Sequence, residues 1–426
     1  MNERMGKLEC NPDRRDGDGD GEGDASRSDY VFSQQDHERL ARARFDEIYQ
    51  YFKDQYARRE VVMQTRTPGG LLLDWVPIES QLGCDKLADP PEENRPVLPD
   101  RSASDQREAF VSFELDREGA VRGPRGTVPM WRRDLERMCP MHTLQDYLSK
   151  NGRANYFKRS PTGERIAFPE AGGTHKYANT SQAVTAYGTE GNINAWDPYV
   201  EWSDEFSLGQ LSLSRGAGSG FQTLEVGQQE YRDLYGDWVP HLFVFYTTNK
   251  YTASGDNKGG YNQDVKGWVQ YSPSIHPGAL SSPQSQFGGT QYILSLKVQL
   301  WQGNWWVRVN GQWIGYYPAS LYNAAGLRNQ ADQVSWFGEI VDSSSHAGTT
   351  ATDMGNGHWP YEGWQHCAYM NNLLVQSNVG GGMQRYSASA SASHPKCYGV
   401  EEHFSNVGSW GSYFWWGGSG RNSQCP

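Results

Sequence analysis

The feature that most constrains the fold of this chain is a regular alternation of apolar and polar residues in its C-terminal half. The clearest example is the run from Tyr292 to Trp301. Its apolar side chains recur at every second position, at Leu294, Leu296, Val298 and Leu300. Because successive side chains of a β-strand point to opposite faces of a sheet, this run predicts a strand with one buried face and one wetted face. From Thr174 onward, similar runs are separated by turn residues roughly every 8 to 15 positions, which is typical of a sandwich or barrel.

A second local signal is the pair Asn310-Gly311, which lies between the apolar runs Trp305–Val309 and Gln312–Tyr316. Such a pair supplies the positive φ angles of a two-residue type I′ turn, so this segment predicts a β-hairpin. The composition agrees, because 16 Trp, 24 Tyr and 48 Gly residues suit pleated sheets joined by tight turns. We therefore expect an all-β fold: an antiparallel β-sandwich domain preceded by a small α+β N-terminal unit.

The length of 426 residues exceeds what one ordinary hydrophobic core holds, so two domains are expected. Residues 1–30 are polar and acidic and are expected to form a disordered tail. Residues 31–150 should form the N-terminal unit, residues 151–172 a linker, and residues 173–426 the β-sandwich. Within the N-terminal unit, the periodicity predicts helices at 34–58 and 143–150 and strands at 71–78 and 109–115.

Charge and motif content exclude several classes of function. The formal net charge of -11 argues against a nucleic-acid partner, which needs a basic face. The sequence has no apolar stretch of the roughly 18 residues that a membrane span requires, and no signal-peptide h-region is visible at its N-terminus. It also lacks zinc-ligand spacing, a Gly-x-Ser-x-Gly elbow and a phosphate-binding loop, so we expect neither a metal nor another cofactor.

Two glutamates stand out because Glu is depleted in strands and is rarely fully buried. Glu225 lies in Phe221–Gln228 and Glu339 lies in Val334–Val341, and both segments otherwise consist of apolar, small or uncharged residues. Gly227 and Gly338 are close neighbours of these glutamates and leave room for a substrate backbone to approach each strand.

Two carboxyl groups brought together in a partly dry cleft cannot both ionise easily, so one is held protonated while the other is charged. The charged group can take a proton from a water that attacks a peptide carbonyl, and the protonated group can assist the carbonyl oxygen and the leaving nitrogen. On the alternation alone, each glutamate could instead be an edge-strand or salt-bridged carboxylate.

The segments around both glutamates resemble the neprosin family of glutamic peptidases. Phe221–Asp237 (FQTLEVGQQEYRDLYGD) is similar to the family segment around one catalytic Glu, and Val334–Val341 (VSWFGEIV) to the segment around the other. Further blocks follow in the family's order, at Thr174–Ala178, Ile193–Pro198, Asp204–Leu208, Gly315–Pro318 and Met354–His358. The resemblance covers about residues 174–426 and implies that Glu225 and Glu339 are the catalytic pair.

The resemblance carries further expectations. Its members are secreted sandwich-fold endopeptidases that cleave after proline, so it implies a peptide or protein substrate and allows for a proline-rich one. It also implies substrate-binding roles for Gln228, Tyr235 and Trp336, which lie in the same two segments. Thr65–Ile78 resembles the family's activation domain, which implies an acid-activated zymogen whose N-terminal unit covers the cleft as an intramolecular inhibitor and is cut off within 151–172. Protonation of carboxylates between the two units would open the site.

The cysteines match the family pattern in part, and two segments near the first glutamate differ from it. The residues around Cys397 and Cys425 resemble the family's C-terminal bridged pair, which implies a disulfide between them. Sequence does not fix the pairing of the other cysteines, which are Cys10, Cys84, Cys139 and Cys367. Gln228 replaces a Trp that the family often has, and Thr252–Asn262 lacks the family's cysteines, which puts proline specificity in doubt.

Two other functions remain open from the sequence. A glycoside hydrolase also uses paired carboxylates in an aromatic cleft, and a carbohydrate-binding β-sandwich would use the glutamates only as hydrogen-bond acceptors. The aromatic residues of the segment 301–317 suit either a sheet core or a groove in which rings stack on proline or sugar.

Overall fold

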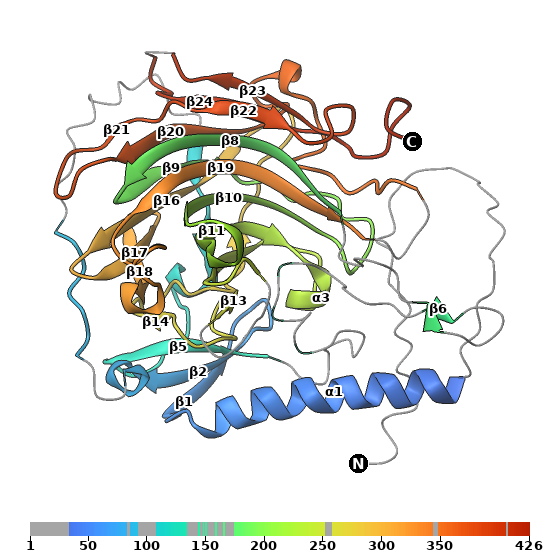
Figure 1. The fold of residues 1–426 in the computed structure, drawn as a ribbon. Helices are drawn as coiled ribbons and strands as arrows, with labels where there is room; N and C mark the ends of the chain where they lie inside the picture. The colour runs from blue at the N-terminus through green and yellow to red at the C-terminus, as the bar shows by residue number, and fades with distance from the viewer. Residues whose placement is uncertain are drawn as a thin grey trace.

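Two large sheets packed face to face form the C-terminal part of the protein, and a smaller unit with a long helix lies beneath them (Figure 1). The structure is a computed structural model. It describes residues 34–82, 86–92, 108–133, 144, 148, 150, 158–159, 165–166, 174–251, 258–343, 348–405 and 408–426.

The first sheet is antiparallel and has seven strands within the described residues. In spatial order, they are β13 (Gly259–Tyr261), β12 (His241–Thr247), β11 (Gln222–Glu230), β10 (Phe206–Arg215), β19 (Ala331–Asp342), β8 (Thr174–Ala186) and β22 (Ser389–Ala392). A single-turn helix, α3 (Arg232–Tyr235), follows β11. The central position of β10 places β11 and β19 on either side of it.

The second sheet has ten strands within the described residues. Its main path is β14 (Val269–Gln270), β18 (Gln312–Pro318), β17 (Asn304–Val309), β16 (Gln291–Trp301), β9 (Gly188–Asn194), β20 (Ala368–Gln376), β24 (Tyr413–Gly417) and β23 (Gly399–His403). Two short strands pair off this path, β21 (Gln384–Arg385) with β20 and β3 (Glu108–Phe110) with β16.

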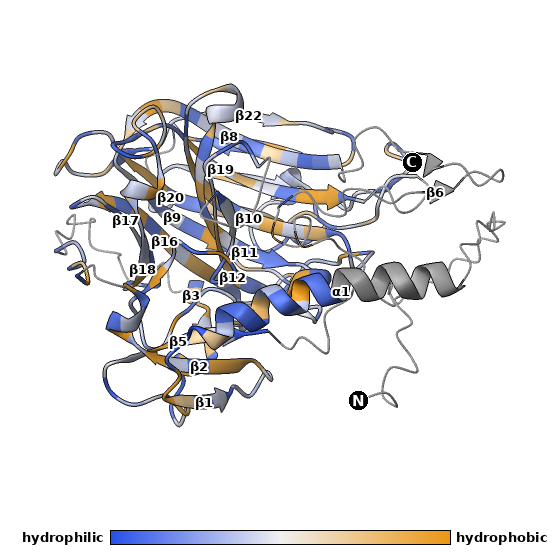
Figure 2. Cartoon of the chain, turned by 60° about the horizontal axis from the view of Figure 1, so that its bottom comes forward, coloured by the Kyte–Doolittle hydropathy of each residue, from blue (hydrophilic) through white to orange (hydrophobic). Residues whose placement is uncertain are grey.

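The core lies between the two sheets and follows the alternation of the strands. Leu211 and Val226 of the first sheet and Leu296 and Trp305 of the second belong to one cluster of buried side chains. Figure 2 shows apolar and hydrophilic stretches along the strands of both sheets. The sandwich therefore buries one face of each sheet against the other, and the opposite faces are left for other contacts.

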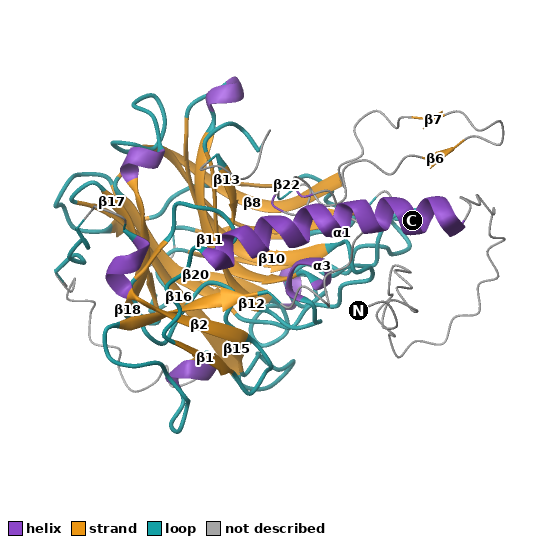
Figure 3. Cartoon of the chain, turned by 90° about the horizontal axis from the view of Figure 1, so that it is seen from below, coloured by secondary structure: helices purple, strands orange, loops and turns teal. Residues whose placement is uncertain are grey.

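The N-terminal unit has its own three-stranded sheet and a helix. The sheet contains β1 (Met63–Arg66), β2 (Leu72–Pro77) and β5 (Thr127–Arg132). The helix α1 (Gln34–Ala57) crosses in front of the first sheet when the protein is seen from below (Figure 3). Within this unit, η1 (Ile78–Gln81) follows β2, and η2 (Glu114–Asp116) follows β4 (Ser112–Phe113).

Two strands of the N-terminal unit also pair with strands of the C-terminal part. β3 pairs in parallel with the start of β16, and β4 (Ser112–Phe113) pairs with β15 (Ser281–Ser282). The segment that joins the two parts contains the short pair β6 (Lys158–Arg159) and β7 (Arg165–Ile166). The strands of the N-terminal unit would have to separate from β16 and β15 before that unit could leave.

The predicted fold class is confirmed: the protein is an antiparallel β-sandwich preceded by an α+β unit. The predicted hairpin is β17 and β18, and its turn residues Asn310 and Gly311 have φ angles of 46° and 87°. Of the helix predicted at 143–150, Leu144 and Leu148 are helical. The tail 1–30, most of the linker 151–172, and Cys10, Cys84 and Cys139 lie outside the described residues.

Candidate active site

Glu225 and Glu339 lie on the face of the first sheet that points away from the sandwich core. Glu225 of β11 pairs with Ser212 of β10, and Glu339 of β19 pairs with Leu208 of the same strand. Both glutamates are nearly fully buried, at 1% and 2% exposure. Because β10 lies between their strands, the two side chains approach each other across the face of β10.

The two glutamates converge on one cation, the ammonium group of Lys150. Lys150 Nζ lies 2.5 Å from Glu225 Oε2 and 2.8 Å from Glu339 Oε2. The sum of these distances, about 5.3 Å, is an upper limit on the separation of the two carboxylate oxygens. Gln210 of β10 lies between them, accepting a hydrogen bond from Lys150 Nζ at 3.0 Å and donating to Glu339 Oε2 at 3.4 Å.

Each carboxylate is anchored through its other oxygen. Glu225 Oε1 accepts hydrogen bonds from the hydroxyls of Thr223, at 2.8 Å, and Tyr251, at 2.7 Å. Glu339 Oε1 lies 2.6 Å from Nδ1 of His175 on β8. The sheet thus fixes one oxygen of each glutamate and leaves both Oε2 atoms directed at the same point.

Tyr251 is held in place by an unusual backbone. Lys250 and Tyr251 both adopt left-handed conformations, with φ angles of 60° and 61°. Two successive non-glycine residues in this region carry a conformational cost, which persists only where the surroundings enforce it. Burial, followed by the charge of Glu225, raises the pKa of Tyr251 well above its ordinary value. The phenol therefore stays protonated and remains a hydrogen-bond donor to Glu225.

Lys150 and His175 set the electrostatic surroundings of Glu339. Burial by itself would raise the pKa of Glu339, but the charge of Lys150 and the contact with His175 lower it to about 2. Burial opposes the charged form of Lys150, yet the two glutamates outweigh it and raise its pKa above the ordinary value. Glu339 and Lys150 are therefore ionised together in this state.

Aromatic rings form the walls around the ammonium group. Lys150 Nζ lies 6.0 Å from the ring centre of Phe243 on β12 and 5.9 Å from that of Phe337 on β19. Phe245 and Tyr261 stand next to Phe243 on the same face. The ammonium group that contacts both glutamates therefore also lies close to apolar rings.

The N-terminal unit covers this side of the first sheet. Trp131 of β5 stacks on Tyr235 with ring centres 5.7 Å apart, and Tyr235 stacks on His241 at 4.0 Å. Arg133 forms a buried ion pair with Asp264. From α1, Tyr51 and Gln55 donate hydrogen bonds to the backbone carbonyl of Asp264.

The three predicted substrate-binding residues have different locations. Tyr235 lies on the covered side, beneath Trp131. Gln228 and Trp336 face the sandwich interior instead: Gln228 donates a hydrogen bond to the carbonyl of Trp196, and Trp336 donates one to Thr189 of the second sheet. The structure therefore does not bring Gln228 or Trp336 together with the glutamates. The reason is that side chains alternate between the two faces of a strand. Residues 228 and 336 lie three positions from residues 225 and 339, and therefore on the other face of the sheet.

The residues that sequence reasoning missed are Lys150, His175, Gln210, Thr223 and Tyr251. Thr223 shares a strand face with Glu225, so the alternation could have identified it. His175 lies in a block that resembles the family, but its contact with Glu339 depends on the pairing of β8 with β19. Lys150 stands at the expected end of a helix, where a lysine is ordinary, and only the tertiary structure reveals its role.

The remaining sequence predictions concern the cysteines, a metal site and a membrane span. A disulfide joins Cys397 and Cys425, and Cys367 is a buried free thiol. Among the residues that the structure describes, no cluster of three or more His, Cys, Asp or Glu side chains could hold a metal ion. No helix in the described part of the chain is long and apolar enough to cross a membrane.

Comparison with known proteins gives one family match. The family model described as Neprosin matches residues 203–419, which is half of the chain and includes both glutamates. Two solved structures also match, a homodimeric agglutinin from chicken liver (CG-16) and a toad ovary galectin in complex with thio-digalactose. Each is 9% identical with a TM-score of 0.20; they cover 39% and 38% of this chain, and 94% and 91% of their own. Scores this low support no inference about fold or ligand.

Proposed function

The chain belongs to the neprosin family, and from this premise we propose that it is a glutamic endopeptidase that hydrolyses peptide bonds with Glu225 and Glu339. The observation that carries the proposal is the convergence of Glu225 Oε2 and Glu339 Oε2 on one point, 2.5 Å and 2.8 Å from the same nitrogen. A water molecule placed at that point would contact both carboxylates, as a hydrolytic acid-base pair requires.

Glu339 is the proposed base and Glu225 the proposed acid. The contact of His175 with Glu339 Oε1 belongs to the sandwich itself, and it remains after Lys150 has left. The contact with His175 lowers the pKa of Glu339, so it favours the ionised form of that carboxyl group. Two carboxyl groups this close cannot easily both be charged without a cation between them, which leaves the role of the acid to Glu225.

The reaction follows from this assignment. Glu339 removes a proton from the water while the water oxygen bonds to the peptide carbon, and Glu225 gives its proton to the carbonyl oxygen. As the tetrahedral intermediate collapses, the carbon–nitrogen bond breaks and the nitrogen takes the proton held by Glu339. The proton on the former carbonyl oxygen returns to Glu225. One water is consumed and both glutamates regain their starting forms.

We propose further that the full-length chain is a zymogen. Lys150 fills the point that the catalytic water needs, and its segment joins the N-terminal unit to the sandwich. Trp131 and Arg133 cover neighbouring residues of the same side. Cleavage in the linker 151–172 and acidification would then release the N-terminal unit as an intramolecular inhibitor.

The substrate is proposed to be a proline-rich peptide or protein that is cut after proline outside the cell. The aromatic walls at Phe243 and Phe337 support this, because flat apolar rings pack well against a proline ring. The cleavage after proline and the extracellular location are proposed from membership of the neprosin family.

The proposal is tested by incubating the processed protein at about pH 4, in the range where one of two paired carboxyls is protonated. Three probes are used: a proline-containing peptide, the same peptide with Pro replaced by Ala, and a panel of glycans. Mass spectrometry identifies the bond that is cut. We expect cleavage of the first peptide on the carboxyl side of proline and slower cleavage of the second. Equal cleavage of both peptides would refute the proline preference alone, and cleavage of glycans but not of peptides would refute the peptidase.

A further inference from the structure

The second sheet carries an aromatic platform on the side opposite to the glutamates. It consists of Tyr271, Trp301, Trp306, Trp313 and Tyr316. Ring centres lie 4.6 Å apart for Trp306 and Tyr316, 5.3 Å for Trp306 and Tyr271, and 6.1 Å for Trp306 and Trp313. Trp305 and Tyr317 point into the core, so by the alternation of β17 and β18 the platform faces outward.

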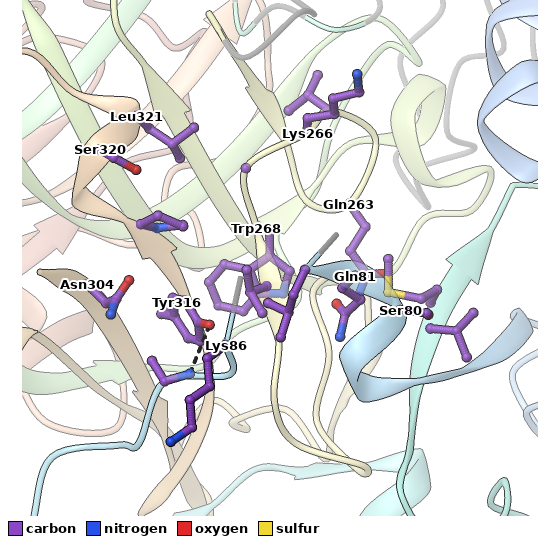
Figure 4. Close-up of a pocket in the computed structure, with 18 of the residues that line it drawn as sticks. Ser80, Gln81, Lys86, Gln263, Lys266, Trp268, Asn304, Tyr316, Ser320 and Leu321 are labelled. Atoms are coloured by element: carbon purple, nitrogen blue, oxygen red, sulfur yellow. Dashed lines mark hydrogen bonds between the residues drawn. The ribbon is translucent and has the colours of Figure 1, made fainter. Parts of the chain in front are cut away.

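A segment of the N-terminal unit covers this platform. Leu82, Leu87 and Ala88 pack against it, and the backbone N–H of Ala88 donates a hydrogen bond to the hydroxyl of Tyr316 at 3.3 Å (Figure 4). Residues 86–92 form neither helix nor strand, and Pro91 is buried. A stretch of chain that contributes leucine and alanine side chains therefore lies against large aromatic rings.

The same segment occupies the free edge of the second sheet. β14 is the terminal strand, and its residue Gln270 pairs on the outer side with the side chain of Gln81. Gln270 N–H donates to Gln81 Oε1 at 2.9 Å, and Gln81 Nε2 donates to the carbonyl of Gln270 at 3.0 Å. The side-chain carboxamide of Gln81 therefore pairs with both the N–H and the C=O of Gln270. A peptide group of a neighbouring strand would make the same two hydrogen bonds. Without the carboxamide, this edge would offer a donor and an acceptor to an added strand.

A pocket of about 790 Å³ opens between this segment and the sandwich, and its lining includes Lys86 of the segment and Trp268, Asn304 and Tyr316 of the sandwich (Figure 4). The indole N–H of Trp306 is fully buried and has no acceptor among the described residues. A peptide carbonyl is the kind of acceptor that such a donor takes.

We propose that the β14 edge and the aromatic platform bind an extended stretch of the polypeptide substrate once the N-terminal unit has left. The favoured stretch carries small or aliphatic side chains, like those of Leu87 and Ala88. This inference rests on the proposed peptidase function and adds a second binding surface on the opposite face of the sandwich. Only a substrate long enough to reach round the sandwich engages both the surface and the glutamates.

The experiment starts from the full chain with a specific protease site inserted into the linker 151–172, which is cut and then acidified to release the N-terminal unit. Two substrates share one cleavage sequence: an octapeptide, and a longer peptide in which an uncharged Leu-Ala-Pro-rich extension follows. The test variant is Trp313→Ala, a half-buried platform residue. The matched control is Trp410→Ala, a half-buried tryptophan of another aromatic cluster on the same sheet.

The proposal predicts that Trp313→Ala raises KM for the long substrate about tenfold, as expected when an aromatic contact of an interface is lost. KM for the octapeptide and kcat for both substrates should stay unchanged, and Trp410→Ala should change none of them. Equal kinetics of Trp313→Ala and the parent on the long substrate would overturn the proposal, because the platform would then only anchor the N-terminal unit.

A binding measurement separates this inference from the peptidase assignment. The probe is a fluorescent peptide of residues 78–92 with Cys84→Ser, titrated onto processed protein that carries Glu225→Gln. We expect binding that Trp313→Ala weakens about tenfold and that the long substrate displaces. If the parent cleaves neither substrate, the peptidase assignment fails. The titration still shows whether the β14 edge and the aromatic platform bind a peptide. Absence of binding, or failure of the long substrate to compete, would overturn the surface.

Discussion

Replacing Lys150 with methionine should release the active site of the full-length chain without any cleavage. The change removes the ammonium group between Glu225 and Glu339 and keeps a long unbranched side chain. Removing one partner of a buried ion pair costs about 3–5 kcal/mol, because the remaining charge is left uncompensated. The cost falls on the closed form alone, since solvent reaches both glutamates once Lys150 and the segment around it have moved away.

The ratio of open to closed protein should therefore rise about 100- to 3,000-fold, at about 1.4 kcal/mol for each factor of ten. Uptake of one proton by the glutamate pair offsets part of the cost, so the effect should be largest near neutral pH. Cleavage of a quenched fluorescent peptide by the uncut chain at about pH 6 measures it, with processed wild type as the positive control.

The matched control is Lys176→Met. Lys176 is also a buried lysine in an ion pair, 2.6 Å from Asp342, but it alternates with His175 on β8 and its partner is neither glutamate. It should lower stability without activating the uncut chain. If Lys150→Met remained as inactive as the uncut wild type, while both became equally active after processing, Lys150 would not be what restrains the site.

Three further predictions concern pH, the base and the disulfide. Because the pKa of Glu339 in the closed form is lowered to about 2, its contribution to that form is present above the ordinary carboxyl pKa of about 4.3 and is lost as pH falls towards 2. The nicked N-terminal unit should dissociate in that window, which size-exclusion chromatography detects; dissociation only above pH 7 would contradict it. His175→Gln should move the acidic limb of the kcat/KM profile of the processed protein to higher pH, since Glu339 loses its cationic neighbour, and an unmoved limb would argue against Glu339 as the base. Replacing Cys397 and Cys425 together by serine should lower the free energy of unfolding of the sandwich by about 2–4 kcal/mol in urea denaturation, because their loop spans 28 residues; an unchanged urea midpoint would show that the bridge adds no stability.

Local patterns predicted the elements of the sandwich well. The alternation in Tyr292–Trp301 became β16, and Asn310-Gly311 became the turn between β17 and β18. These features depend on side-chain period and on backbone freedom, which are properties of neighbouring residues. What the sequence did not predict was the insertion of β3 beside β16, because pairing between strands so far apart in the chain leaves no local signal.

The candidate site shows the same limit. Glu225 and Glu339 stood out because a glutamate inside a buried strand is unusual, but it was the resemblance of their segments to the neprosin family that indicated a catalytic pair; both are buried. Side-chain alternation, applied to Gln228 and Trp336, would have placed them on the core side. Lys150 comes from outside the sandwich, so no periodicity within the strands could have pointed to it.

The most direct test of the account is the rate of peptide hydrolysis by processed Glu225→Gln and Glu339→Gln variants at about pH 4, compared with processed wild type. Thermal melting of each variant confirms that it is folded. If the two carboxylates act as acid and base on one water, each substitution should reduce kcat at least about 1,000-fold, within the range that positioned acid-base groups contribute. A folded variant of either kind that cleaves the peptide at the wild-type rate would contradict the assignment of the pair.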